Sequence, residues 1–411
     1  DLHRQVLARF RNEWTSLHSD DTCFCCIRRR PQFGLPCAHS VCENCVRVFG
    51  ASSESGPWVS SVPVCFLCDR GTDGVRIRLK PDTASVRVLS FDGGGARALA
   101  SLEFVRAMQA AVGLPYPVQQ NFDVVYGTSS GAIIACALCI NGWPVEDCIA
   151  CFGLLARLAF RPRFWWLRSH FLFALCQLLL PLLVDSRYPA KKLETLLQKV
   201  FGARRSIMDC SKATETGANV GITVTTIQDA SACIFTSYNA VGQRDGNTDY
   251  HALKPEGGVR RIPLWKILRC STAAPAYFRP QDIEGLGTFQ DGGLTFNNPA
   301  SVALREAAVL FPDAAEPSLV VSLGTGSARA EGPRISKSRR LWRDSFPLRV
   351  FRAFWHHGSS KRAWQQLLSH RKAGRTGEFF RFDVEFEGSE PRLDDVAEMP
   401  EIARAAREAI S

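Results

Sequence analysis

Two glycine-framed turns, each preceded by a short apolar run and followed by a helical pattern, constrain the fold of this chain most strongly. The first turn, Asp92–Arg97 (DGGGAR), follows Val86–Phe91, and the second, Gly127–Gly131 (GTSSG), follows Phe122–Tyr126. Strand-length runs that alternate with helical patterns are typical of an α/β sheet with helices on its faces. The alternation continues in three later runs: Val220–Thr226, Cys233–Tyr238 and Leu319–Ser322.

The second turn has the G-x-S-x-G form of a nucleophile elbow, which makes Ser129 the candidate nucleophile. Small flanking residues let such a serine lie exposed on a strained turn. The first turn would present unpaired backbone N–H groups at a helix start, where they can hold a developing oxyanion. A nucleophile together with an oxyanion hole indicates acyl transfer.

A nucleophilic serine needs a base, and Asp291 is the favoured candidate. Asp291–Gly293 follows a short run, and its glycines indicate a tight turn that presents the carboxylate. In a dyad, Asp291 would act on the serine directly. In a Ser-Asp-His arrangement it would orient His356, His357 or His370. Because these histidines lie in a basic region that reads as peripheral, the sequence favours the dyad.

The first turn also matches a dinucleotide-binding fingerprint, G-x-G-x-x-[GA], at Gly93, Gly95 and Ala98. That motif requires an acidic residue at the end of the next strand. Here the next apolar run ends at Gly127-Thr128-Ser129 instead, and no Walker lysine follows the glycines. Dinucleotide binding and a P-loop are therefore disfavoured.

Eight of the 16 cysteines lie between Cys23 and Cys68. Such clustering in a large chain indicates metal binding in a reducing compartment, so we expect a cytoplasmic protein. Four ligand pairs can close two tetrahedral sites for structural zinc, which would organise a segment with too little apolar material to fold alone. The ligand candidates are Cys23, Cys26, Cys37, His39, Cys42, Cys45, Cys65 and Cys68.

Over Cys23–Cys68 this spacing resembles a RING finger of the C3HC4 type. That family's interleaved arrangement implies one zinc ion on Cys23, Cys26, Cys42 and Cys45, and a second on Cys37, His39, Cys65 and Cys68. Cys25 is an extra thiol that could replace Cys26. RING fingers often recruit ubiquitin-conjugating enzymes, but Cys25 stands where an aliphatic residue is common, and the usual arginine is displaced to Arg70. We therefore expect a structural or protein-docking module, with ubiquitin ligation as the alternative.

Two further cysteine pairs, Cys136/Cys139 and Cys148/Cys151, lie in apolar helical sequence behind the elbow. They have neither a neighbouring histidine nor turn glycines. Cysteines three residues apart on a helix are commonly buried packing residues. We expect that role for both pairs, and no third metal.

From Asp92 to Gly326 the chain resembles the patatin-like phospholipases. Three blocks of that family stand in order: D-G-G-G-x-R at Asp92–Arg97, G-T-S-S-G at Gly127–Gly131, and D-G-G at Asp291–Gly293. The resemblance implies a three-layer sandwich around a central, mostly parallel sheet. Supporting stretches are Tyr188–Gly202, Phe235–Asn239, Cys270–Phe278, Asn297–Pro299 and Ser322–Gly326.

The same resemblance implies a lipid acyl hydrolase of phospholipase A type that forms an acyl-enzyme on Ser129, with Asp291 as the proton acceptor. The oxyanion would be held by N–H groups of Gly93, Gly94 and Gly95, with Arg97 nearby. One departure is Ala98, where the family usually has glycine. Alanine would strain the loop if that position needed a positive φ.

The segment Phe164–Val184 is unusually apolar, but its charge-free part from Phe171 is only about 14 residues long, against roughly 20 for a bilayer-spanning helix. It reads as a buried helix with a connector, or as a lid that touches lipid, with a membrane span as the third alternative. Basic residues could attract anionic headgroups or form a solvated helix face. They are Arg161, Arg163, Arg168, Arg339 and Arg340. We expect a lipid substrate, peripheral membrane association and, since no Ca²⁺-loop pattern is evident, hydrolysis without Ca²⁺.

The 411 residues, 46% of them apolar, can form more than one domain with a large core. We expect a lead-in helix over 1–20, a zinc finger over 21–70, a hydrolase domain over 84–330 and a basic, helical extension over 331–411. The net charge of +10 favours anionic partners, but no aromatic recognition motif accompanies the basic residues, so nucleic acid is not expected. The alternative function is a RING-type ubiquitin ligase or zinc-dependent scaffold with a weak or lipid-sensing hydrolase domain.

Overall fold

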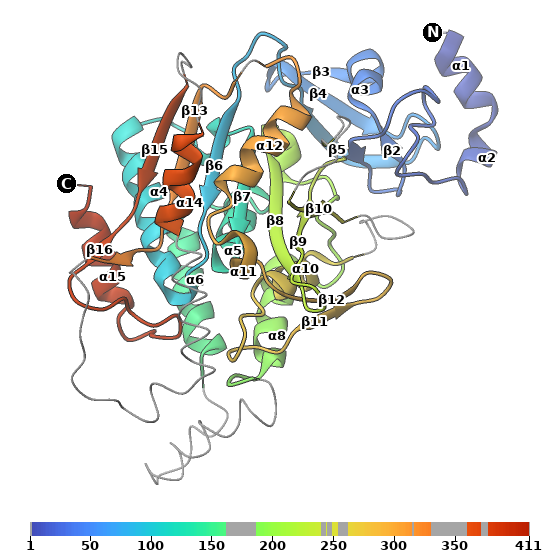
Figure 1. Cartoon of the computed structure of the whole chain (residues 1–411). Coiled ribbons are helices and arrows are strands. Elements are labelled where there is room, and N and C mark those ends of the chain that lie inside the picture. The colour runs from blue at the N-terminus through green and yellow to red at the C-terminus, as the bar shows by residue number, and fades with distance from the viewer. Residues whose placement is uncertain are drawn as a thin grey trace.

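Figure 1 shows the computed structural model of the chain, in which a helix-covered sheet carries a smaller N-terminal region at one side. The residues that it describes are 2–161, 186–239, 244, 249–253, 262–314, 316–329, 360–370 and 377–410. Several residues singled out above lie outside this part of the chain. They are the apolar segment 164–184, Arg163, Arg168, Arg339, Arg340, His356 and His357.

The central sheet has nine strands in the described part of the chain. Their bounds are β6 Arg87–Phe91, β7 Val124–Thr128, β8 Asn219–Thr226, β9 Ala232–Thr236, β10 His251–Ala252, β11 Gln281–Ile283, β12 Gly287–Asp291, β13 Leu319–Leu323 and β15 Glu378–Phe382. The main order is β10-β9-β8-β7-β6-β13-β15, while β12 pairs with β8 and β11 with β12. Five of these pairings are parallel, and those of β8 with β9 and β12, and of β11 with β12, are antiparallel.

Burial on both faces explains why the central strands read as continuous apolar runs. Successive side chains of a strand point to opposite faces, and a sheet covered on both sides needs apolar residues at each position. In β6, Leu89 and Phe91 belong to one hydrophobic core and Val88 to another. In β7, Val125 belongs to the first core and Val124 to the second.

Helices cover the two faces of the sheet and complete three layers. The first core contains residues of α4, α5, α6, α8, α10 and α15, whereas the second contains residues of α12 and α14. The expected three-layer α/β fold is therefore confirmed. The helix bounds are α4 Leu99–Val112, α5 Ser130–Cys139, α6 Val145–Ala159, α8 Ala190–Phe201, α10 Leu264–Ser271, α12 Ala300–Leu310, α14 Ser360–Ser369 and α15 Met399–Glu408.

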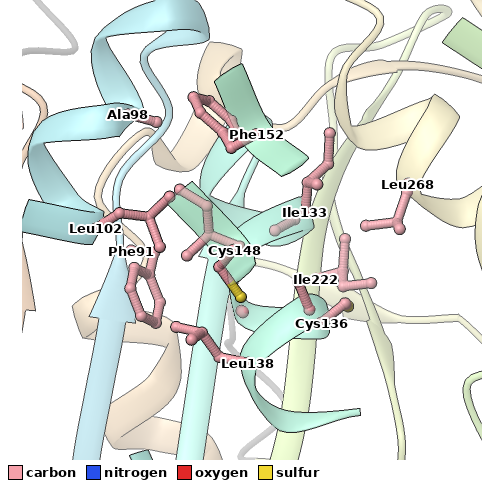
Figure 2. Close-up of a cluster of buried hydrophobic side chains, with 14 of the residues drawn as sticks. Phe91, Ala98, Leu102, Ile133, Cys136, Leu138, Cys148, Phe152, Ile222 and Leu268 are labelled. Atoms are coloured by element: carbon pink, nitrogen blue, oxygen red, sulfur yellow. The ribbon is translucent and has the colours of Figure 1, made fainter. Parts of the chain in front are cut away.

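The cysteines behind the elbow pack in the first core. Figure 2 shows Cys136 and Cys148 among buried side chains that include Ile133 and Phe152. Burial raises the pKa of Cys139 and of Cys148 to about 12, so both thiols stay neutral at ordinary pH. The expected packing role is confirmed for these cysteines.

The sheet continues beyond residue 330, where the sequence placed the end of the hydrolase domain. Strand β15 pairs in parallel with β13, and α15 contributes Met399 and Ile402 to the first core. The last 34 described residues, 377–410, therefore belong to the same fold as the central sheet. Smaller elements are η1 Gly95–Ala98, η2 Val118–Asn121, α9 Lys212–Thr216, α11 Gly293–Phe296, β14 Ser327–Ala328 and β16 Glu385–Phe386.

The N-terminal region has its own core, formed by cysteines together with residues such as Val41, Val62 and Ile77. Strands β3, β4 and β5 form an antiparallel sheet, so β5 occupies residues expected to be a linker. Two short helices replace the single expected lead-in helix. The bounds are α1 Leu2–Arg9, α2 Arg11–Trp14, β1 Phe33–Gly34, β2 Ser40–Val41, α3 Glu43–Phe49, β3 Ala51–Ser53, β4 Gly56–Val64 and β5 Gly71–Arg78.

Candidate active site and metal sites

Ser129 and Asp291 are in direct contact, although 162 positions separate them in the chain. The Ser129 hydroxyl donates a hydrogen bond of 2.6 Å to Asp291 Oδ2. The other carboxylate oxygen, Oδ1, accepts the backbone N–H of Gly293 at 2.7 Å. Ser129 is 9% exposed and Asp291 only 1%, so the serine lies at the surface of the site and the carboxylate beneath it.

Strand β8 brings these two side chains together. β7 runs parallel to β8 and ends at Thr128, which pairs with Thr223. β12 runs antiparallel to β8 and ends at Asp291, which pairs with Val224. Ser129 directly follows Thr128, so neighbouring positions of one strand set the distance between hydroxyl and carboxylate.

The backbone at Ser129 has the strained geometry of a nucleophile elbow, with φ 55° and ψ −124°. Residues other than glycine rarely adopt a positive φ, and such strain is concentrated at functional sites. Close packing after the serine requires glycine, because a Cβ at Gly131 would lie 2.5 Å from the Asp92 carbonyl oxygen. The N–H of Ser129 donates to Ser271 Oγ at 2.9 Å, which fixes the turn.

Burial raises the pKa of Asp291 to about 7. The hydrogen bonds from Ser129 and from the Gly293 N–H, and the charge of Arg269, favour the ionised carboxylate and oppose that shift. A carboxylate with a pKa near neutrality is suited to accept a proton and return it.

Of the three candidate histidines, the described residues include His370. Its Nδ1 lies 2.7 Å from the carbonyl oxygen of Gln366, and its side chain is exposed at the end of α14. Within the described part of the chain, the Ser129 hydroxyl is hydrogen-bonded to Asp291 and to no histidine. This geometry favours the dyad over a relay through His370.

The three glycines of the first turn differ in the partners of their N–H groups. Gly93 donates to the Asn297 carbonyl oxygen at 3.1 Å, and Gly94 donates to Ser130 Oγ at 3.2 Å. Among the described residues, the Gly95 N–H has no acceptor. Gly95 has φ 56°, a conformation that favours glycine, and it lines the pocket at Ser129. Of the three, Gly95 is therefore the best-placed oxyanion donor.

A second donor, the N–H of Ser130, was not named from the sequence. Ser130 begins α5, and the first N–H groups of a helix have no intrahelical acceptor. In nucleophile elbows the residue after the nucleophile supplies one donor of the oxyanion hole. No acceptor for this N–H lies among the described residues. The elbow motif itself was the signal that could have identified it.

Arg97 does not face the oxyanion site. Its Nη1 lies 2.7 Å from Glu390 Oε2 and donates to the Gly326 carbonyl oxygen at 3.3 Å. The guanidinium therefore joins the turn to the C-terminal segment, which corrects the position that the resemblance implied. Ala98 has φ −63°, an ordinary value for alanine, so the departure from the family's glycine introduces no strain.

An apolar pocket opens at the serine and runs between the helices that contribute to the first core. It is lined mostly by side chains of α6 and by the segment that follows α10, with few polar groups. The lining residues are Gly94, Gly95, Ser129, Ser130, Ile133, Phe152, Leu155, Ala156, Ala159, Phe160, Leu193, Thr272, Ala274, Tyr277, Phe278, Asp291 and Leu393. Apolar walls around a nucleophile suit a ligand with a hydrocarbon chain.

The cysteine-rich region contains two groups of side chains that could hold a metal ion. The ligand atoms of each group lie within 4.8 Å of one another. Sulfur atoms around tetrahedral zinc lie about 3.8 Å apart when each Zn–S bond is about 2.3 Å. Cys23 Sγ lies 3.8 Å from Cys45 Sγ, and Cys26 Sγ lies 3.8 Å from Cys42 Sγ. The first group therefore fits zinc.

The second group contains Cys37, His39, Cys65 and Cys68. His39 Nδ1 lies 3.4 Å from Cys37 Sγ and 3.5 Å from Cys65 Sγ, close to the separation of about 3.5 Å for sulfur and nitrogen on one zinc ion. The other ring nitrogen, Nε2, lies 2.8 Å from the Trp14 carbonyl oxygen. Donation to that oxygen leaves Nδ1 unprotonated for the metal.

The cysteine-rich region is attached to the domain of the central sheet by hydrogen bonds. The Asn239 side-chain amide donates to the carbonyl oxygens of Asp20 and Pro31, each at 2.9 Å. Nearby, Gly34 pairs with Asp209 in an isolated parallel bridge. Asn239 is 8% exposed, so this contact is largely shielded from water.

Within the described residues, no helix has both the length and the apolar character needed to cross a bilayer. Of the five arginines that could attract anionic headgroups or form a solvated helix face, Arg161 lies within these residues and is exposed after α6.

Comparison with known proteins gives one family match, described as Patatin-like phospholipase, over residues 89–304. Calcium-independent phospholipase A2-gamma of Homo sapiens is 32% identical over 255 residues, covering 59% of this chain and 28% of that protein. Patatin-like protein 2 of Arabidopsis thaliana is 27% identical over 309 residues, covering 66% of this chain and 67% of that protein. The crystal structure of VipD from Legionella pneumophila aligns with 88% of this chain and 69% of that chain, at 12% identity and a TM-score of 0.35.

The family match covers just over half of the chain and begins after the cysteine-rich region. The chain spans about a quarter of the length of the calcium-independent phospholipases that it resembles. The likeness therefore concerns the sheet and its two glycine-framed turns.

Proposed function

The chain belongs to the patatin-like phospholipase family, and on this premise we propose that it is a lipid acyl hydrolase with a Ser129–Asp291 dyad. The observation that carries the proposal is the hydrogen bond of 2.6 Å from the Ser129 hydroxyl to Asp291 Oδ2, at a strained elbow that opens into an apolar pocket. Relatives named calcium-independent phospholipases support an ester of a lipid as the substrate and a reaction without Ca²⁺.

The reaction proceeds in two steps. Asp291 takes the proton of the Ser129 hydroxyl as its oxygen attacks the ester carbonyl, and the N–H groups of Gly95 and Ser130 hold the oxyanion. When the intermediate collapses, the proton passes from Asp291 to the departing alkoxide, and an acyl-enzyme remains. Water then attacks this ester with Asp291 as the general base, which releases the fatty acid and restores the serine.

The pH dependence of hydrolysis tests the role of Asp291. The base acts in its ionised form, and burial raises its pKa to about 7. We expect kcat/KM to level off above pH 7 and to fall about tenfold per pH unit below it. The measurement is kcat/KM on an uncharged ester between pH 5 and 9. A flat profile, or an acidic limb that disappears when His356, His357 and His370 are replaced by Gln, would contradict the assignment.

The pocket supports an acyl chain as the group held beside Ser129. A second apolar pocket shares Ile133, Phe152 and Leu155 with the first and extends to Trp143 and Val200. The ring of Phe152 is 5% exposed and borders both spaces. We propose that Phe152 limits the length of the acyl chain.

Phe152→Ala is expected to join the two pockets and shift the preference toward longer chains. Each additional buried methylene contributes about tenfold or more in discrimination, so the ratio of kcat/KM for a long ester over a short one should rise by about tenfold. Phe104→Ala is the matched control, because Phe104 is buried in the same core and lines neither pocket. An unchanged chain-length profile in Phe152→Ala would contradict the proposal.

The cysteine-rich region is proposed to bind two structural zinc ions away from the reacting atoms. Its attachment through Asn239 supports a docking and stabilising role. We also propose a cytoplasmic location and peripheral membrane association through Arg161 and the other basic residues. The alternative, ubiquitin ligation, predicts ubiquitin transfer in vitro that Ser129→Ala leaves intact. The hydrolase function is supported if Ser129→Ala loses ester hydrolysis and the wild-type protein transfers no ubiquitin.

A further inference from the structure

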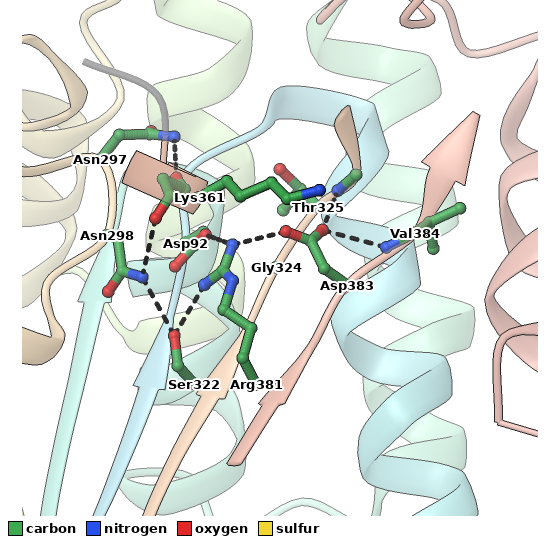
Figure 3. A network of polar contacts seen from close by, with 12 residues as sticks. Asp92, Asn297, Asn298, Ser322, Gly324, Thr325, Lys361, Arg381, Asp383 and Val384 are labelled. Atoms are coloured by element: carbon green, nitrogen blue, oxygen red, sulfur yellow. Dashed lines mark hydrogen bonds and ion pairs between the residues drawn. The ribbon is translucent and has the colours of Figure 1, made fainter. Parts of the chain in front are cut away.

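A buried ion pair lies directly behind the glycine-rich turn (Figure 3). Arg381 Nη2 lies 2.6 Å from Asp92 Oδ2, and the two side chains are 8% and 0% exposed. Asp92 follows β6 and is the first residue of the turn whose Gly94 and Gly95 line the pocket at Ser129. A carboxylate with no access to water is costly without a partner charge, so Arg381 is the group that keeps Asp92 ionised.

Arg381 reaches Asp92 across a neighbouring strand. It pairs with Ser322 on β13, and Ser322 pairs with Ser90 on β6. Two strand spacings amount to about 9.5 Å, which the arginine and aspartate side chains span together. On the way, Arg381 Nη1 donates to Ser322 Oγ at 2.7 Å, which fixes the side chain's path.

A second set of contacts runs from Arg381 to the turn itself. Arg381 Nη2 also lies 2.7 Å from Asp383 Oδ2, and Asp383 Oδ1 accepts the Gly326 N–H at 2.8 Å. The preceding residue, Thr325, donates its hydroxyl to the Gly93 carbonyl oxygen at 3.0 Å. Arg381 therefore holds the glycine-rich turn at both Asp92 and Gly93.

The same turn is held from a third side. Asn297 accepts the Gly93 N–H through its carbonyl oxygen and donates its side-chain amide to Ser360 Oγ at 2.8 Å. With Gly93 fixed in this way, Gly95 is left with its N–H free in the pocket. The contacts thus decide which amide of the turn remains available.

Fold stability alone is a weak explanation for this pair. Replacing a buried ion pair by apolar residues of similar volume is often neutral or stabilising, whereas removing one partner is strongly destabilising. Arg381 and Ser360 also lie beyond residue 304, where the family match ends. This chain's own C-terminal segment therefore supplies the groups that brace the turn.

We propose that Arg381 is a positioning residue for ester hydrolysis, acting through Asp92 to hold the glycine-rich turn so that the Gly95 N–H meets the oxyanion. The inference rests on the proposed hydrolase function. It makes the segment beyond residue 330 part of the catalytic apparatus. Because Arg381 contacts neither substrate nor Ser129, it should affect the transition state and leave substrate binding nearly unchanged.

The test compares full-length wild type, Arg381→Met, the double variant Asp92→Asn with Arg381→Met, and Arg404→Met. Arg404 is the matched control, because it lies in the same C-terminal segment, 56% exposed and paired with Glu401 and Glu408. For each protein, kcat and KM are measured on a short-chain ester, together with the thermal midpoint. The affinity for a trifluoromethyl ketone, whose tetrahedral adduct bears an oxyanion, is compared with that for the matching non-reactive ether.

Arg381→Met should lower kcat by about 100-fold, the effect of losing one oxyanion donor, with KM within about threefold of wild type. Affinity for the ketone should fall in parallel, and affinity for the ether should not. The double variant, which has no unpaired buried charge, should regain the wild-type thermal midpoint and remain slow. If Arg381→Met does not fold, the double variant alone gives the answer.

Two results would overturn the inference. One is a double variant whose kcat returns to wild type together with its thermal midpoint, because Arg381 would then serve stability only. The other is an Arg381→Met protein with the kcat of Arg404→Met. Either result would leave the proposed hydrolase function intact. If the folded wild-type protein hydrolyses no ester, both the hydrolase function and the role of Arg381 are contradicted.

Discussion

Ser129→Ala is expected to lower the turnover of lipid ester hydrolysis by about 10⁶-fold, the loss seen when an activated serine nucleophile is removed. The hydroxyl that donates to Asp291 is the attacking atom, and no neighbouring hydroxyl can replace it. Ser130 Oγ accepts the Gly94 N–H, and Ser271 Oγ accepts the N–H of Ser129 itself. The measurement is fatty acid release from phospholipid vesicles in buffer without added Ca²⁺.

Ser318→Ala is the control for this loss. Ser318 lies just before β13, and its hydroxyl donates to Ser85 Oγ at 2.9 Å, away from the pocket. Its replacement should leave turnover within about twofold of wild type, as expected for a surface substitution. Hydrolysis that continues at more than about one hundredth of the wild-type rate in Ser129→Ala would show that another group is the nucleophile.

Removal of zinc is expected to unfold the N-terminal region. Structural zinc contributes about 10–16 kcal/mol to the folding of small zinc domains, and much of the core of this region consists of cysteine side chains. Cys45→Ser should lower the zinc content from two ions per chain and abolish amide protection over residues 23–78. Because Asn239 holds the carbonyl groups of Asp20 and Pro31, protection around residue 239 should fall as well.

Cys151→Ser serves as the control for zinc loss, since Cys151 lies on α6 outside both metal-binding groups. Zinc is counted by elemental mass spectrometry, and protection is measured by hydrogen exchange on the full chain. If the amides of residues 23–78 stay fully protected from hydrogen exchange in the zinc-free protein, a structural role for the metal is contradicted. Zinc that is lost equally in Cys151→Ser would contradict the ligand assignment.

Much of the fold could be predicted from the sequence because its signals are local. Strands β6, β7, β8, β9 and β13 are apolar runs, and both glycine-framed turns stand at strand ends. Strand β15 was missed, since its sequence EFFRF includes the charged residue Arg381 and forms an edge strand with no fully buried residue. Contacts far along the chain, with Asp92 289 positions away and with Ser322 59 positions away, explain that arginine.

The site could be predicted in part, because some of its signals are also local in the sequence. The elbow and the Asp-Gly-Gly turn identify Ser129 and Asp291 through their own neighbours. Which glycine N–H is free depends on tertiary contacts, because the acceptors of Gly93 and Gly94 lie on distant segments. The direction of Arg97 depends likewise on Glu390, 293 positions later in the chain.

Labelling with a fluorophosphonate probe tests the central claim most directly, that Asp291 activates Ser129 without a histidine. Intact mass is followed over time for the wild type, for Asp291→Asn and for a variant with Gln at His356, His357 and His370. The account predicts one adduct per chain on Ser129, an unchanged labelling rate in the histidine variant and a rate at least about 100-fold lower in Asp291→Asn. Labelling that is lost in the histidine variant, or that is unchanged in Asp291→Asn, would contradict it.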